Sequence, residues 1–464
     1  MAPPRRAAAP LPPPHNTKGW LSRCRRPPRN RKGSSSTRAA VDPLATVPDD
    51  LLFDAIFSPV FSNAGDVTRC AAVCRRWGRI VAAREAAILR ALPLPDRFLP
   101  HLALGFFHVG QRDLGSTRRR QLSAHQAQTD PCFVPMPSAS VLLGSPFPGL
   151  PEGVDAAARS GGLFHNARPV ASRGGRVVFE LRSKARADGV ALSVCNLMTG
   201  DVALVPPLAG DDFPGHDYAC AVLTADDLDG DDAQPGSSFF SLVLVYNRRS
   251  FTALRCYTSD DAGGGWGPEF RKPGAQISGH VLHRLGPAVV LRGVVYWPIV
   301  VAAALAVRLD GAAAAAVMDV HVVPYSTRAT SLPDWSLLGT MPDGRLSYVS
   351  AGVAGSDLRF LVETLDVSTA AGAEWERGES ISTQLTVPTT SELELKMRWL
   401  GEKSGTLLFT IGEGGSSSGA FALNLATRSV DKLADGVECN SWRSLYGYEM
   451  DPTALLASIT ARFN

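Results

Sequence analysis

The chain has 464 residues, of which 45% are hydrophobic and 20% charged, a composition typical of a soluble protein with two or three domains. The formal net charge is +3, but residues 1–41 hold ten Lys and Arg and no Asp or Glu, which leaves 37 basic against 44 acidic residues in the remainder. A mildly acidic body argues against a general nucleic-acid-binding surface.

The eight cysteines are scattered without a CxxC pair, which predicts reduced thiols in an intracellular protein. No hydrophobic signal-peptide core follows Met1. The longest uncharged apolar run, residues 293–307, contains Pro298 and is shorter than the roughly 20 residues of a spanning helix. We therefore expect no membrane segment and a location in the cytoplasm, the nucleus or both.

Residues 1–42 are rich in Pro, Arg and Ser and have almost no side chains for a core, so we expect a disordered basic tail. An acid-free segment of this kind could be an organelle transit peptide. Its stretch CRRPPRNRK at 24–32 could be a nuclear localisation signal. A solvated tail without a targeting role is the third interpretation.

Residues 43–92 form the first predicted domain, which contains three amphipathic helices. The first helix begins at Pro48, a residue that a first helical turn tolerates, and ends at the next proline. Asp66 is the expected N-cap of the second helix, whose apolar residues recur every three or four positions as far as Trp77. A bend at Gly78 leads to the third helix.

Residues 93–464 form the second predicted domain, a mostly antiparallel all-β body. Short β-branched and aromatic runs are separated there by Gly, Asp, Asn and Pro. The fold class is thus α+β, a small helical domain followed by a β domain. The clearest strands are expected at 174–181, 239–247, 292–300, 344–352, 358–365 and 405–412.

A weak internal repeat predicts how these strands are organised. The runs GGRVVFEL at 174–181 and SGTLLFTIG at 404–412 are each followed by a second strand that ends in Asn-Leu-x-Thr, at 196–199 and 424–427. A further strand then begins with a valine. Repeated groups of antiparallel strands are typical of propeller blades, so we expect a β-propeller-like domain.

The helical domain resembles the F-box. The stretches Val-Pro-Asp-Asp-Leu-Leu at 47–52, Ile-Phe at 56–57 and Arg-Cys-Ala-Ala-Val-Cys-Arg-Arg-Trp at 69–77 are similar to the pattern of that family. Its usual form is Leu-Pro, an acidic residue, Leu, then Ile-Phe, then Val-Cys-arginine-Trp. The resemblance covers residues 44–90. It implies a three-helix unit that binds the Skp-family adaptor of a cullin-RING ubiquitin ligase.

The same resemblance explains why the stretch VPDDLLFDAIF at 47–57 is apolar on two sides. One side would face the core of the domain and the other the adaptor, because a unit of about 50 residues is too small to hide so many large side chains. The adaptor-facing residues that the family implies are Pro48, Leu51, Leu52, Ile56, Val73, Cys74 and Trp77.

Parts of the β domain are similar to the propeller-like F-box-associated regions of large plant F-box families. These parts are Cys-Tyr-Thr-Ser-Asp at 256–260 with Trp266, Gly-Val-Val-Tyr-Trp at 293–297, and Tyr-Glu-Met-Asp at 448–451. Tryptophans could also line a target-binding face, although burial statistics favour core positions for them. The four candidates are Trp266, Trp297, Trp399 and Trp442.

No sequence pattern predicts a metal site, a cofactor or a catalytic group. Cys70 and Cys74 have the spacing of ligands on one helix face, and His280 lies close to His283, but neither pair has further ligands nearby. The stretch GSSSG at 415–419 precedes an expected strand, whereas a nucleophile elbow requires a helix there. An acidic loop at 226–233 lacks the first and last ligands of a calcium loop.

The resemblance implies the substrate-recognition subunit of a Skp-cullin-F-box ubiquitin ligase, which is not itself an enzyme. The helical domain would bind the adaptor, and the β domain would bind an unidentified target protein. Two alternatives stay open. One is a β-propeller enzyme or a carbohydrate- or other ligand-binding protein with an incidental helical N-terminus. The other is an F-box protein that acts outside the ligase.

Overall fold

The computed structural model describes fourteen stretches of the chain, apart from single positions inside them. They are 47–109, 131–139, 164, 167–181, 189–224, 227, 239–259, 265–300, 303–309, 318–324, 333–365, 375–387, 393–412 and 418–451. The basic tail at 1–42, most of the acidic loop at 226–233 and residues 413–417 lie outside the described residues.

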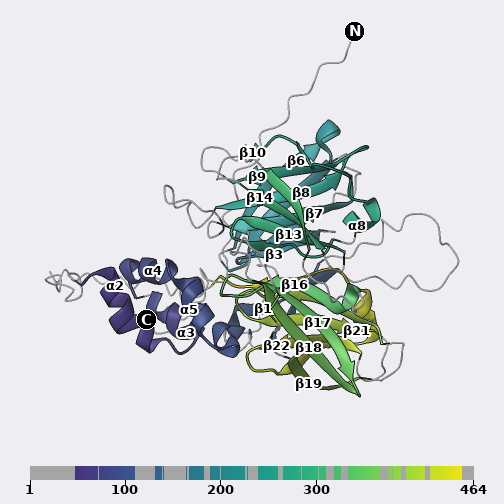
Figure 1. The fold of residues 1–464 in the computed structure, drawn as a ribbon. Coiled ribbons are helices and arrows are strands. Elements are labelled where there is room, and N and C mark those ends of the chain that lie inside the picture. Colours follow the sequence, from purple (N-terminus) through teal and green to yellow (C-terminus); the bar gives the residue numbers. More distant parts are fainter. Residues whose placement is uncertain are drawn as a thin grey trace, which may run out of the picture.

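Helices occupy the N-terminal part of the described chain (Figure 1). Helix α2 (Asp49–Leu52) continues directly into the π-helical turn η1 (Phe53–Phe57) and the 3-10 turn η2 (Ser58–Val60). The helices α3 (Ala64–Ala71), α4 (Arg75–Ala82) and α5 (Glu85–Ala91) follow. We call residues 47–92 the helical unit. Its small core includes Leu52, Val67, Val81 and Leu89.

The second predicted helix is divided in two, as α3 and α4. Asn63, and not Asp66, is the N-cap of α3, because Asn63 Oδ1 accepts a hydrogen bond from the amide of Asp66 at 3.1 Å. The break between the two helices precedes Trp77, whereas the predicted bend at Gly78 falls inside α4. A Cβ at Gly78 would come within 3.0 Å of the Ala71 carbonyl oxygen, so this glycine lets α4 pack closely on α3.

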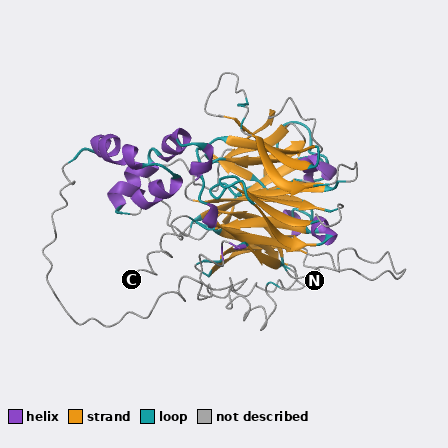
Figure 2. Cartoon of the chain, turned by 90° about the horizontal axis from the view of Figure 1, so that it is seen from below, coloured by secondary structure: helices purple, strands orange, loops and turns teal. Residues whose placement is uncertain are grey.

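The β part of the described chain is a six-bladed propeller of antiparallel sheets (Figures 1 and 2). Blade 2 contains β3 (Arg168–Arg173), β4 (Arg176–Leu181), β5 (Gly189–Asn196) and β6 (Asp201–Ala209). Blade 3 contains β7 (Tyr218–Thr224), β8 (Phe240–Asn247), β9 (Thr252–Thr258), β10 (Gly265–Trp266) and β11 (Phe270–Arg271). The short helix α8 (Gly279–His283) leads to blade 4, which contains β12 (Val289–Leu291), β13 (Val294–Val300), β14 (Ala303–Leu309) and β15 (Met318–Pro324).

Blades 5 and 6 follow the same antiparallel order. Blade 5 contains β16 (Ser336–Thr340), β17 (Leu346–Ala354), β18 (Asp357–Leu365) and β19 (Ser380–Thr386). Blade 6 contains β20 (Leu395–Leu400), β21 (Thr406–Ile411), β22 (Gly419–Asn424) and β23 (Val430–Asp435).

Blade 1 joins the two ends of the β domain. Its inner strand β24 (Arg443–Glu449) comes from the C-terminal end and pairs with β1 (Ala103–Val109), which in turn pairs with β2 (Cys132–Pro135). The inner strands β24, β3, β7, β12, β16 and β20 contact one another in this order and close a ring. Ring closure of this kind leaves only short sheet edges exposed.

The propeller that the repeat predicts is confirmed. The two copies of the repeat are the second to fourth strands of blades 2 and 6. Asn196 and Asn424 stand at equivalent turns, where each side-chain oxygen accepts a hydrogen bond from the amide two residues later. The six predicted strands correspond to β4, β8, β13, β17, β18 and β21.

The apolar cores lie mainly between neighbouring blades. Trp297 is fully buried in the cluster between blades 3 and 4, and Phe360 meets Phe409 between blades 5 and 6. Two 3-10 turns, η3 (Leu94–Arg97) and η4 (Pro100–Leu102), connect α5 to β1. Between them, Phe98 enters the core of blades 5 and 6, while Leu99 packs on both the helical core and the core of blade 1. The views in Figures 1 and 2 agree that the helical unit projects from one side of the propeller.

Candidate functional site

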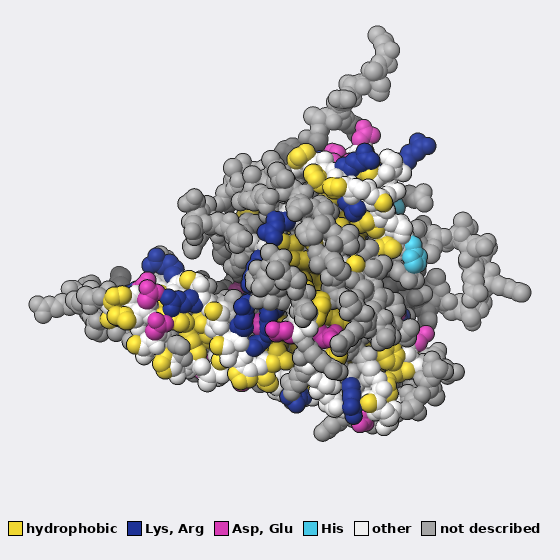
Figure 3. Space-filling view, viewed as in Figure 1, with side chains coloured by type: hydrophobic (Ala, Val, Ile, Leu, Met, Phe, Trp, Pro, Cys, Tyr) yellow, Lys and Arg dark blue, Asp and Glu magenta, His cyan; other side chains and the backbone are white. Residues whose placement is uncertain are grey.

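The helical unit carries most of the large apolar side chains that the described chain exposes. Leu51, Val60 and Val73 are 59%, 64% and 61% exposed, and the two others in the described residues, Leu204 and Val437, lie on separate elements of the propeller. Figure 3 shows hydrophobic side chains gathered on the helical unit beside charged ones. Exposed apolar side chains grouped on one small unit make the helical unit a candidate surface for binding a partner.

The first helical segment has two apolar sides for a local reason. Leu52 is fully buried in the helical core, while its neighbour Leu51 faces outward. Successive side chains of a helix are rotated by about 100°, which lets Leu52 enter the core while Leu51 points to solvent. Phe53, at the start of the π-helical turn, is half-buried against that core.

Ion pairs hold this segment against the following helices. Arg76 Nη2 lies 2.7 Å from Asp49 Oδ1, and Arg84 pairs with Asp50. The Arg84 guanidinium also stands 4.4 Å from the ring centre of Phe53. The carboxylates are well exposed, so each pair contributes little to stability, and together they place charge beside the exposed apolar residues.

The predicted adaptor-facing residues divide into three groups. Exposed residues are Pro48, Leu51, Val73 and Cys74. Trp77 is half-buried and packs against the helical core, and Leu52 is fully buried, so Leu52 supports the surface from within and does not form part of it. The side chain of Ile56 lies outside the described residues. Val60 is exposed as well, although the sequence pattern did not single it out.

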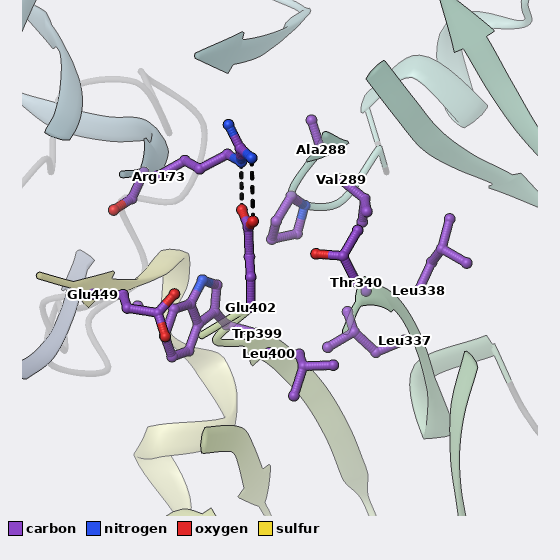
Figure 4. A pocket seen from close by; sticks show the side chains of 14 residues that line it. Arg173, Ala288, Val289, Leu337, Leu338, Thr340, Trp399, Leu400, Glu402 and Glu449 are labelled. Atoms are coloured by element: carbon purple, nitrogen blue, oxygen red, sulfur yellow. Dashed lines mark hydrogen bonds and ion pairs between the residues drawn. The ribbon is translucent and has the colours of Figure 1, made fainter. Parts of the chain in front are cut away.

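A second candidate site is a cavity of about 40 Å³ inside the ring of inner strands (Figure 4). One wall is apolar, and the other carries charged and polar groups. The apolar wall is formed by Ala288, Val289, Leu337, Leu338 and Leu400. The polar wall includes Ser172, Arg173, Glu402 and Glu449, whereas Thr340 lies beside the apolar residues Val289 and Leu338 (Figure 4).

Arg173 joins three blades at the polar wall. Its Nε and Nη2 pair with the two carboxylate oxygens of Glu402, the Nη2 contact at 3.2 Å (Figure 4). Its Nη1 pairs with Asp227, which follows β7. Burial alone would lower the pKa of Arg173, but the Glu402 and Asp227 carboxylates outweigh burial and raise it. Arg173 is therefore a permanent cation that ties blades 2, 3 and 6 together at the end of their inner strands.

Glu449, the last residue of β24, is a buried carboxyl at the same wall. Burial, together with the charge of Glu402, raises the pKa of Glu449 to about 7. Its Oε1 accepts hydrogen bonds from the amides of Lys403, at 3.1 Å, and Ser404. The sequence pattern did not identify Arg173, Glu402 or Glu449 as site residues, because they are far apart in the chain and only the closure of the ring brings them together.

The tryptophans occupy mainly core positions, as the sequence interpretation favoured. Trp297 and Trp399 are buried, and Trp266 and Trp442 are half-buried. Trp399 also lines the cavity. Trp442 stacks on His108 with ring centres 3.8 Å apart.

The histidines and cysteines that the sequence analysis considered as ligands do not form a cluster in the described residues. In the stretches that the structure describes, no group of three His, Cys, Asp or Glu side chains is arranged to hold a metal ion. His280 is exposed on α8, and burial together with Cys74 raises the pKa of the Cys70 thiol. None of the helices described is both long and apolar enough for a membrane span.

Comparison with known proteins gives one family match. A family model described as a domain of unknown function (DUF7595) matches residues 153–461, a range that includes the described strands from β3 to β24. No curated protein matches the chain.

Three solved structures are distantly similar. A protein from Lactobacillus plantarum is 13% identical with a TM-score of 0.30, over 56% of this chain and 82% of that one. An alpha-L-arabinanase from Penicillium chrysogenum, complexed with arabinobiose, is 13% identical with a TM-score of 0.29, over 55% and 76%. A prolyl endopeptidase is 12% identical with a TM-score of 0.31, over 81% of this chain and 55% of that one. Likenesses at these TM-scores carry no argument about function.

Proposed function

The chain belongs to the DUF7595 family, whose description assigns no function, and we propose that it is the substrate-recognition subunit of a Skp-cullin-F-box ubiquitin ligase. The helical unit binds the Skp-family adaptor, and the propeller binds a target protein. Ubiquitin transfer takes place on other subunits of the ligase, so this chain acts by holding the target at high effective concentration near the transfer site. Such a ligase would work in the cytoplasm or the nucleus.

One observation carries the proposal. Leu51, Val60 and Val73 are each more than half exposed on a single unit of about 50 residues, in a stretch of sequence that resembles the F-box. The adaptor surface that we propose therefore includes Pro48, Leu51, Val60, Val73 and Cys74, with Trp77 at its margin. Leu52 is reassigned to the supporting core.

Co-purification with a Skp-family adaptor tests the proposal. The variant Leu51→Asp with Val73→Asp places two charges on the proposed surface without opening the helical core, and it should abolish adaptor capture while the propeller stays folded. The matched control is Leu204→Asp, which charges an exposed leucine on β6 and should leave capture unchanged. Capture that survives the double substitution would exclude this surface and with it the proposed function.

The alternative function is that of an enzyme or a ligand-binding protein. Its site would be the cavity inside the ring of inner strands, which we call the axial cavity. Small-molecule sites usually have volumes of about 300–1,000 Å³. The axial cavity is far smaller, at about 40 Å³. The carboxylate of Glu402 is also paired with Arg173, which reduces its capacity to bind a ligand. This cavity accommodates a few water molecules better than a sugar or a peptide.

An F-box protein that acts outside the ligase shares the adaptor surface but not the later steps. Reconstitution with adaptor and cullin separates the two functions. If the complex of this chain with the adaptor recruits cullin, the ligase function is supported. If the adaptor complex forms but excludes cullin, the chain acts as a two-protein complex instead.

A further inference from the structure

Arg97, in η3, connects the end of the helical unit to the propeller. Its Nε and Nη2 donate to the carbonyl oxygens of Leu92, at 2.8 Å, and Arg90, at 2.9 Å, at the end of α5. Its Nη1 lies 2.6 Å from Oδ2 of Asp343, a side chain with no exposed surface. One guanidinium therefore satisfies the last carbonyls of a helix and a buried carboxylate of the propeller at the same time.

Asp343 belongs to a tight turn between β16 and β17. The amide of Met341 donates to the carbonyl of Arg345 at 2.9 Å, and Arg345 Nε lies 2.9 Å from the same Asp343 oxygen that Arg97 contacts. Two guanidinium groups thus share one carboxylate oxygen. We call residues 341–345 the first seat turn.

The residues after Arg97 dock on a second turn, between β20 and β21. The amide of Leu99 donates to the carbonyl of Lys403 at 2.8 Å. The ring of Phe98 lies only 2.6 Å from the place where a Cβ of Gly405 would stand, and Gly405 has a φ of +63°. Only glycine allows both this backbone conformation and the close approach of the ring. We call residues 401–405 the second seat turn.

The second seat turn lines the axial cavity, and the first seat turn directly follows a strand that lines it. Thr340, which lines the cavity, directly precedes the first seat turn, and Glu402, which pairs with Arg173, lies inside the second. Glu449 holds the second seat turn from the other side through the amides of Lys403 and Ser404. The cavity wall and the attachment of the helical unit are therefore built from the same backbone.

We propose that Arg97 is a positioning residue that fixes the helical unit on the propeller, and that the axial cavity is coupled to this attachment through the two seat turns. Breaking the Arg173–Glu402 pair then loosens residues 97–99, although neither of those side chains contacts Arg97 in the structure. The inference rests on the proposed function only in its biological consequence, which is that a fixed helical unit holds a target at a constant distance from the ligase.

Hydrogen exchange of the full-length chain, followed by mass spectrometry, tests both parts. Arg97→Ala should speed exchange in peptides covering residues 85–99 by roughly tenfold, because charged hydrogen bonds that hold this segment are lost. Arg97→Lys keeps the charge but has one donor nitrogen in place of three. It should increase the exchange rate less than Arg97→Ala does. Glu402→Gln should also speed exchange in the same peptides.

Two comparisons distinguish coupling from general destabilisation. Glu269→Gln weakens the pair that Glu269 forms with Arg248 at 2.5 Å in blade 3, and it should not change exchange at residues 85–99. Peptides from β8 and β9 should exchange at the same rate in Glu402→Gln as in the unmodified chain. Faster exchange everywhere would mean that Glu402 is only a stability residue, and the coupling would be rejected.

A replacement variant and two negative results complete the test of the coupling and of the positioning role. If Glu402→Gln does not fold, Arg173→Lys weakens the same pair and replaces it in the test. Unchanged exchange at residues 85–99 in these cavity variants rejects the coupling, and unchanged exchange in Arg97→Ala rejects the positioning role. Adaptor capture is measured separately with the Leu51 and Val73 variant, so a failure of the proposed function leaves the exchange result interpretable.

Discussion

Leu51 and Leu52 are consecutive residues of α2, yet Leu51 is 59% exposed while Leu52 has no exposed surface. Leu52 packs with Val67 and Leu89 in the core of the helical unit. The two leucines therefore have separate roles, one in the stability of the helical unit and the other in the surface that it presents.

This difference predicts that the same substitution has very unequal effects on stability at the two positions. Leu52→Ala should lower the free energy of unfolding of the helical unit by about 2–5 kcal/mol, because it leaves a cavity in the core. Leu51→Ala should change it by less than about 0.5 kcal/mol, since the side chain is already in solvent. Hydrogen exchange of peptides from α3 and α5 in increasing urea measures both changes. Equal losses at the two positions would contradict the assignment of Leu52 to the core.

Sequence patterns were sufficient to predict the strands that are buried on both faces. The strands β4, β8 and β21 read as nearly continuous apolar runs, and their residues are almost all buried between neighbouring blades. The inner strands β3 and β20 were harder to predict, because charged residues interrupt their apolar runs. In β20, with the sequence LKMRWL, buried and half-buried residues alternate, and a similar mixture in β3 gives no clear strand signal.

Neither the residues of the axial cavity nor the pair that attaches the helical unit to the propeller could be predicted in the same way. Arg97 and Asp343 are 246 positions apart, and Arg173 and Glu402 are 229 apart. Ring closure brings these pairs together, and no local spacing indicates them. Leu51 and Val73 of the helical unit were easier to identify, because the short motif that contains them holds more apolar residues than the core of a small unit can bury.

Gly447, in the closing strand β24, is required by the position of Trp399. A Cβ at Gly447 would stand 2.1 Å from the indole of Trp399, which lines the axial cavity. Gly447→Ala should therefore lower the free energy of unfolding by about 1–3 kcal/mol through overpacking. Thermal unfolding measures the loss. Gly352 in β17 is the matched control, because a Cβ there would meet no atom within 4 Å, and Gly352→Ala should not destabilise the chain. Equal melting temperatures for the two variants would count against the close contact.

Glu449 gives the closed propeller a dependence on pH. Its carboxyl is held near Glu402, while Arg173 is the nearby cation and the amides of Lys403 and Ser404 are the donors. Burial and the like charge of Glu402 raise the pKa of Glu449 to about 7, above the ordinary value of 4.5. A carboxyl with a raised pKa in the folded state favours folding at low pH, where it is neutral in both states. That contribution is lost as the pH rises from about 4.5 through about 7.

The unmodified chain should therefore lose stability between pH 5.5 and pH 8 relative to Glu449→Gln, which stays neutral and keeps an oxygen for the amides of the second seat turn. The change over this pH range should approach about 2 kcal/mol at most, because about 1.5 pKa units of the shift lie above pH 5.5 and one unit corresponds to about 1.4 kcal/mol. Thermal unfolding at several pH values measures it. Glu438→Gln, at an exposed position just before β24, should follow the pH profile of the unmodified chain. Parallel profiles for the unmodified chain and Glu449→Gln would show that Glu449 is ionised throughout this range, held by its amide donors and Arg173 despite its burial.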